Sequence, residues 1–167
     1  QIGTVLVPLA PGTTTEIQPE RLSVRGGVAM RLRRGNGHDL LICRDPQGEG
    51  IGVDGVRSDG QLAFLRRDRD LPVYYALVGG TRLHWRTELV GLAQAGSVAV
   101  QRSSSRLRAW TGGEAGNTLR LHLGNRPRFV RLNGQRLEAG AWVYSPQGRR
   151  LSIEVPPGSH ELDVALK

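Results

Sequence analysis

Apolar and polar residues alternate with a period of two along most of this chain. The alternation is clearest in four segments: 28–33, 119–123, 151–155 and 162–166. Within 119–123, three leucines alternate with Arg120 and His122. This period places successive side chains on opposite faces of an extended strand, whereas a helix would need a period near 3.6. The pattern predicts an all-β protein, folded as an antiparallel β-sandwich.

Turn residues separate the alternating segments at short intervals. Gly35-Asn36-Gly37 and Asn133-Gly134 each stand between two apolar segments, which is typical of β-hairpins. Gly79-Gly80 is expected to end a strand over 73–78. The glycine-rich segment 112–116 is interpreted as a loop tip, not a linker. We therefore expect one β-sandwich domain over residues 1–167.

The chain is basic, with a formal net charge of +8, and Lys167 is its only lysine among 23 basic residues. Arginine presents a planar fork that suits carboxylate, sulfate and phosphate, so an anionic partner is one interpretation. A solvated surface that keeps the protein in solution is the other. The apolar runs are too short for a membrane-spanning helix, so no membrane partner is expected.

Sequence motifs for catalysis or metal binding are missing. Cys43 is the only cysteine, which excludes an intrachain disulfide and cysteine-based zinc sites. The four histidines have no metal-ligand spacing, and no nucleophile or phosphate-loop motif occurs. We therefore predict no metal, no cofactor and no catalytic residue within this chain.

Two basic segments are candidates for ligand binding. Strict alternation over 81–87 would place Arg82, His84 and Arg86 on one face of a strand. If one regular strand covered 101–110, its even positions would share a face, including the following: Arg102, Ser104, Arg106, Arg108 and Trp110. Guanidinium groups beside an indole suit an acidic sugar, because the ring stacks on the sugar while arginine binds its anionic group. The alternative is that the arginines protect sheet edges and that Trp110 belongs to the core.

Several segments together resemble the C-terminal β-region of heparinase II/III-like polysaccharide lyases. The segments that carry the resemblance are 5–9, 58–67, 75–83, 129–134, 142–144 and 151–153. In that family an α-helical toroid precedes the β-region, and uronate-containing chains are cleaved by β-elimination. This chain has neither the toroid nor the family's metal-binding motif, so no catalytic residue carries over.

The resemblance implies an accessory C-terminal domain that supports or lines a groove for anionic, uronate-containing polysaccharide. An upstream catalytic domain of the same polypeptide would then perform the chemistry. The chain begins with Gln1, which we interpret as a sign of a processed or excised piece. The family would imply a periplasmic or secreted protein. Two alternatives stay open: a stand-alone carbohydrate-binding module, and a basic sandwich that binds protein or nucleic acid.

Overall fold

The computed structural model describes residues 18–35 and 37–166, all of which lie in strands or in the connections between them. No membrane-spanning helix occurs among these residues. Segment 5–9 of the family resemblance lies outside the described residues. The strands are β1 (Gln18–Leu22), β2 (Gly27–Arg34), β3 (Gly37–Arg44), β4 (Ile51–Val53), β5 (Val56–Ser58), β6 (Leu62–Asp68), β7 (Leu71–Trp85), β8 (Thr87–Arg102), β9 (Arg106–Gly113), β10 (Asn117–His122), β11 (Phe129–Leu132), β12 (Gln135–Arg136), β13 (Trp142–Ser145), β14 (Arg150–Val155) and β15 (Gly158–Ala165).

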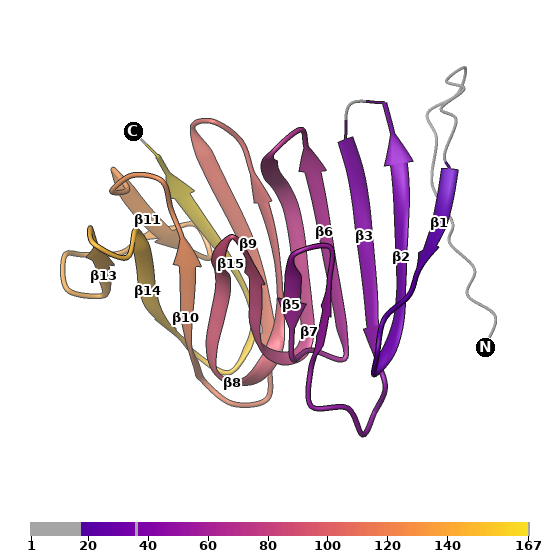
Figure 1. Ribbon diagram of the computed structural model, residues 1–167. Helices are drawn as coiled ribbons and strands as arrows, with labels where there is room; N and C mark the ends of the chain where they lie inside the picture. Colours follow the sequence, from indigo (N-terminus) through magenta and orange to yellow (C-terminus); the bar gives the residue numbers. More distant parts are fainter. Residues whose placement is uncertain (1–17, 36, 167) are drawn as a thin grey trace, which may run out of the picture.

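The strands form one hydrogen-bonded, antiparallel sheet that folds into two layers (Figure 1). The first layer has the strand order β1-β2-β3-β6-β7-β8-β9-β15-β11-β12. The second contains β4 and β5 on one side of β7–β8 and β10, β14 and β13 on the other. The all-β, antiparallel sandwich-like fold predicted from the alternation is therefore confirmed.

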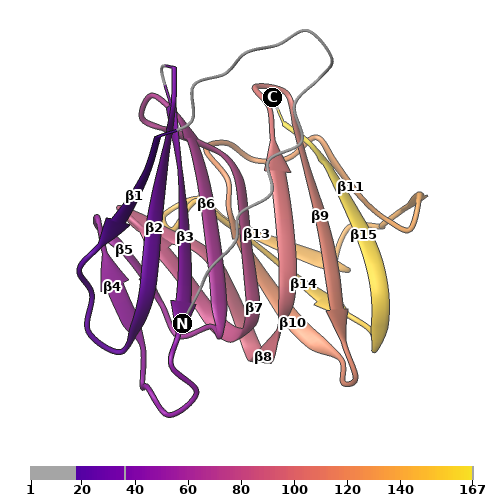
Figure 2. The same ribbon diagram turned by 90° about the vertical axis from the view of Figure 1, so that its right-hand side faces the viewer.

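The hairpin of β7 and β8 belongs to both layers, as the view in Figure 2 also indicates. The first half of β7 pairs with β6 and its second half with β5. In the same way, β8 pairs first with β10 and then with β9. The register of β7 and β8 shifts at Gly80, where the hairpin turns from one layer into the other. The expectation that Gly79-Gly80 ends a strand is wrong, because β7 bends there and continues to Trp85.

A side chain from a neighbouring connection or strand stabilises each bend. Asp59 accepts hydrogen bonds from the backbone N–H groups of Thr81 (2.8 Å) and Arg82 (2.7 Å) in β7. Asn117 accepts hydrogen bonds from two N–H groups of β8, those of Ala93 (2.8 Å) and Gln94 (3.2 Å). These backbone donors lie where the ladder is irregular, so the side-chain oxygens replace missing carbonyl partners.

The two predicted hairpins are present, because β2 pairs with β3 and β11 pairs with β12. Asn133 and Gly134 both have left-handed φ angles, of 50° and 81°, as a two-residue turn of this type requires. The expected continuous strand over 101–110 is wrong. Segment 103–105 forms a turn, in which the Ser103 N–H donates to the Arg106 carbonyl at 2.8 Å. Arg102 therefore ends β8, and Arg106 begins β9.

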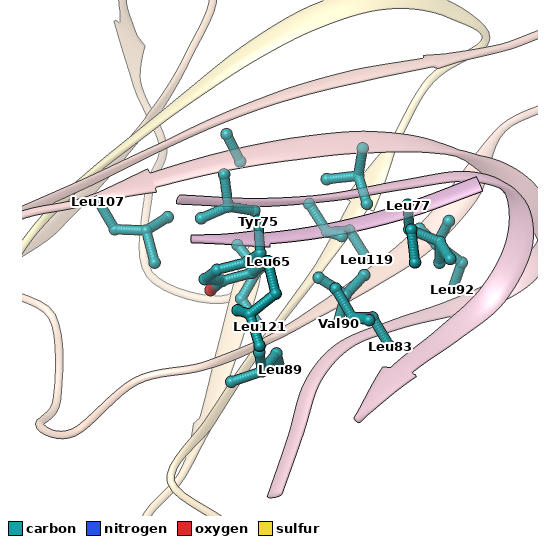
Figure 3. Packing of buried hydrophobic residues seen from close by; sticks show 14 of the residues in the cluster. Leu65, Tyr75, Leu77, Leu83, Leu89, Val90, Leu92, Leu107, Leu119 and Leu121 are labelled. Carbon is teal, nitrogen blue, oxygen red and sulfur yellow. The ribbon is translucent and has the colours of Figure 1, made fainter. Parts of the chain in front are cut away.

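Residues from both layers form one hydrophobic core (Figure 3). Leu65, Tyr75 and Leu107 come from the first layer and pack in the same cluster as Leu119 and Leu121 of the second. All five are at most 1% exposed. Tyr75 and its neighbour Tyr74 point to opposite faces, as alternation predicts, and only Tyr75 is in the core.

The Tyr75 hydroxyl has no hydrogen-bond partner among the described residues. Burial strongly raises the pKa of this phenol, so it is held neutral. We expect Tyr75→Phe to raise the free energy of unfolding by about 1 kcal/mol, because a buried hydroxyl without a partner carries a desolvation penalty. Urea unfolding would measure the change, with Tyr74→Phe as the partly exposed control. A loss of more than about 1 kcal/mol would contradict this account of the hydroxyl.

Candidate anion-binding groove

A groove of about 670 Å³ lies on the outer face of the second layer, where β5, β7 and the start of β8 supply most of its lining. Arg57, Arg82, His84 and Glu88 supply its charged and titratable side chains, together with Asp59. We call it the β5–β7 groove. Alternation explains the placement, because Leu83 and Trp85 of β7 are buried inward while Arg82 and His84 face outward.

Strand pairing brings these side chains together from distant parts of the chain. Arg57 of β5 is directly opposite His84 of β7, and His84 is opposite Glu88 of β8. Directly opposed residues have Cβ atoms about 5 Å apart, so the three side chains form a row across the strands. Neither Arg57 nor Arg82 forms an ion pair with any described residue. Both guanidinium groups are available to an external anion.

A second row of paired residues, parallel to the first, places another arginine beside the groove. Arg82 is opposite Gly91, and Gly91 is opposite Arg120 of β10. A Cβ atom at Gly91 would lie 2.8 Å from a Glu88 oxygen and 3.0 Å from Arg120 Nε, so both side chains cover this glycine. Glu88 also lies 3.7 Å from Arg150 Nη1. Its charge is therefore offset by neighbouring arginines.

Asp59 is an ionised carboxylate on the rim of the groove, and its oxygens already accept hydrogen bonds from β7. Burial by itself would raise the pKa of Asp59, but hydrogen bonds from the Thr81 hydroxyl and from the amides of Arg82 and Thr81 outweigh burial and lower it. These bonds fix the backbone of Arg82 on the rim of the groove. The two carboxylates of the groove, Asp59 and Glu88, balance Arg57 and Arg82, so the positive surplus of this face comes from Arg120 and Arg150 beside the groove.

Arg86 does not share the face of Arg82 and His84, so the predicted three-residue row is wrong at this position. Its φ of 57° is left-handed, and the residue makes the turn between β7 and β8. The guanidinium lies 4.6 Å from the centre of the Trp85 ring and 3.0 Å from a carboxylate oxygen of Asp70. The contact between Arg86 and Asp70 is an exposed surface ion pair.

The second group of candidates lies on the outer face of the other layer. Arg106, Arg108 and Trp110 share the outward face of β9, while Leu107 and Ala109 are buried. Arg102 and Ser104 do not join them, because the turn at 103–105 intervenes. Two hydrogen bonds of 2.5 and 2.7 Å join the Arg106 guanidinium to the Asp163 carboxylate. This arginine is therefore occupied within the fold.

Trp110 is 38% exposed, so the alternative that placed it in the core is wrong. It stands opposite Ala99 of β8 and Glu161 of β15. Together with Ala76, these residues line a shallow groove of about 520 Å³. Of the candidate residues, Arg82 and His84 line the β5–β7 groove and Trp110 lines this second groove. Arg86, Arg106 and Arg108 line neither groove, so the candidate residues do not form one site.

The sequence analysis did not identify Arg57, which lines the groove, or Arg120, which lies beside it. Arg57 belongs to a strand of three residues, which is too short for an alternation pattern to reveal. Arg120 did show the pattern, between Leu119 and Leu121, but only strand pairing places it near Arg82. Among the described residues, no group of three His, Cys, Asp or Glu side chains is arranged to hold a metal ion.

No protein-family model matches the chain, and no curated protein matches it. The resemblance to heparinase II/III-like lyases therefore stays a prediction. The residues that line the β5–β7 groove are therefore the basis for the proposed function.

Proposed function

We propose that this β-sandwich binds acidic polysaccharide through the β5–β7 groove. The observation that carries the proposal is the pair Arg57 and Arg82, which line one groove and have no ion-pair partner among the residues that the structure describes. Guanidinium forks bind carboxylate and sulfate groups with paired hydrogen bonds. Two such side chains in one surface groove suit a chain that carries acidic groups repeatedly.

The lyase resemblance supports a more specific form of the proposal. In that form, the sandwich is an accessory domain that holds a uronate-containing chain beside an upstream catalytic domain. A stand-alone carbohydrate-binding module would use the same groove in the same way. A nucleic-acid ligand is less well supported, because aromatic residues make up only 5% of the chain and single-strand readers stack bases on them.

The test compares two double variants with the same loss of charge. We expect Arg57→Gln with Arg82→Gln to weaken binding to heparin and alginate about three- to tenfold at 0.1 M salt, because each exposed ion contact contributes up to about 1 kcal/mol. The control is Arg25→Gln with Arg126→Gln, which removes two exposed arginines outside the groove. Affinity would be measured by calorimetry or by a retention series in increasing salt.

Three outcomes separate the alternatives. Weaker binding by the groove variant alone supports the proposal. Equal loss in both double variants would mean that net charge is responsible, and the groove would then have no specific role. Single-stranded DNA that displaced alginate at equal charge concentration and fixed salt would favour a nucleic-acid ligand instead.

A further inference from the structure

A second cationic pocket lies between the two layers, lined by residues of β2, β3 and β6 and of the turn between β4 and β5. It measures about 420 Å³. Its charged and titratable lining consists of Arg31, Arg33, His38, Asp54 and Arg67. We call it the Arg67 pocket. It shares no lining residue with the β5–β7 groove.

Strand pairing and a tight turn assemble the pocket. Arg33 of β2 is opposite His38 of β3, and His38 is opposite Arg67 of β6. Asp54 approaches from the turn between β4 and β5, where it has a left-handed φ of 53° and precedes Gly55. A two-residue turn with such angles fixes the position of its side chains.

Arg67 is the central residue of the pocket. Its side chain is only 9% exposed and lies 5.0 Å from the centre of the Trp85 ring. One terminal nitrogen donates to an Asp54 oxygen at 2.7 Å and also contacts His38 Nε2. Its Nε hydrogen has no partner among the described residues, and the same holds for Arg31 Nε. Buried donors of this kind are costly to leave without an acceptor.

The acidic groups at the pocket do not balance the basic ones. Asp54 is shared by Arg67 and by Arg31, which lies 3.0 Å away. Glu20 of β1 lies 3.2 Å from Arg31 and 3.3 Å from Arg33, and serves both. Two carboxylates therefore face three guanidinium groups, and protonation of His38 would add a further positive charge. Burial together with Arg67 and Arg31 lowers the pKa of His38, although Asp54 opposes the shift.

We infer that the Arg67 pocket binds a tetrahedral oxyanion, a sulfate or phosphate group, between Arg31, Arg33 and Arg67. These donors come from two strands that are separated by β3, so they approach a ligand from different directions. A tetrahedral anion offers oxygen atoms in several directions, whereas a carboxylate offers two in one plane. This site goes beyond the proposed polysaccharide groove and does not depend on it.

The test follows the imidazole of His38 by NMR in the full chain. Inorganic sulfate and phosphate would be added at constant ionic strength, with chloride as the balancing ion. We expect the pKa of His38 to rise, because a bound anion favours the protonated imidazole. His122 is the internal reference for nonspecific effects, since Arg102, Arg149 and Arg150 surround it and contribute, after burial, to its lowered pKa.

Variants at exposed arginines keep the test independent of folding. The Arg33 side chain is 63% exposed, so Arg33→Gln leaves the core untouched. We expect it to weaken sulfate binding about tenfold, because one charge-assisted contact is lost. Arg25→Gln, outside the pocket, is expected to leave sulfate binding unchanged.

A sulfated disaccharide that binds more tightly than free sulfate would identify a glycan ester as the source of the group, and equal binding would identify the free ion.

Three results would each overturn the inference. The first is a His38 pKa that responds to sulfate no more than that of His122. The second is a sulfate affinity that Arg33→Gln leaves unchanged, and the third is an effect of acetate as strong as that of sulfate, which would exclude a tetrahedral ligand. Because the β5–β7 groove is probed through Arg57 and Arg82, failure of either proposal would be recognised separately.

Discussion

Replacing Gly80 by alanine is expected to lower the free energy of unfolding by about 3 kcal/mol and the melting temperature by about 10 °C. Gly80 lies at the bend of β7. A Cβ atom there would lie 2.4 Å from the Cα of Gly60 and 2.8 Å from an Asp59 oxygen. The first of these contacts is with backbone, so the two segments would have to move apart.

Gly112→Ala is the matched control for this prediction. Gly112 is also a strand glycine, but a Cβ atom at this position would meet nothing within 4 Å, and its φ is not left-handed. We expect its stability to be unchanged or slightly higher. Both variants would be compared by calorimetry and urea unfolding. Equal stability of Gly80→Ala and the natural chain would show that the bend does not depend on this close approach.

The bend of β7 is the part of the fold that the sequence pattern did not predict. Alternation identified the inward leucines of 119–123, and the Asn133-Gly134 pair marked its hairpin, because both signals are local. A strand that leaves one layer and joins another depends on a contact between Gly80 and Gly60, twenty residues earlier. A double glycine that ends a strand and one that bends it have the same local sequence.

The candidate site, like the fold, could be predicted only where the sequence signal is local. Alternation placed Arg82 and His84 on one outward face, which is where they lie. It failed at Arg86, because a left-handed residue at the turn breaks the period. Arg57 reaches the groove only through the pairing of β5 with β7, and such pairing between distant segments leaves no trace in a single sequence.

The carboxylate of Asp59 links the stability of the bend to the groove. Asp59→Ala is expected to lower the free energy of unfolding by about 3 kcal/mol, because the N–H groups of Thr81 and Arg82 would each lose their acceptor. Asp59→Asn is the conservative comparison, since its amide oxygen can still accept a hydrogen bond. The alanine variant should also bind heparin less tightly, because Arg82 would no longer be held on the rim of the groove.

The Asp59 contribution should depend on pH in a defined direction. The pKa of Asp59 in the folded protein is below its ordinary value of 3.8. Such a group stabilises the fold above the pKa of the unfolded chain, and the contribution is lost as the pH falls through the lower, folded pKa. Urea unfolding of the natural chain and of Asp59→Asn, from pH 7 down to about 2.5, would measure it. The two free energies should converge as the pH falls from 3.8 through the lower, folded pKa, because asparagine does not titrate and Asp59 becomes neutral in the folded protein only below that pKa. A difference that stayed constant over this range would mean that the charge of Asp59 does not stabilise the bend, and that its oxygen acts only as a neutral acceptor.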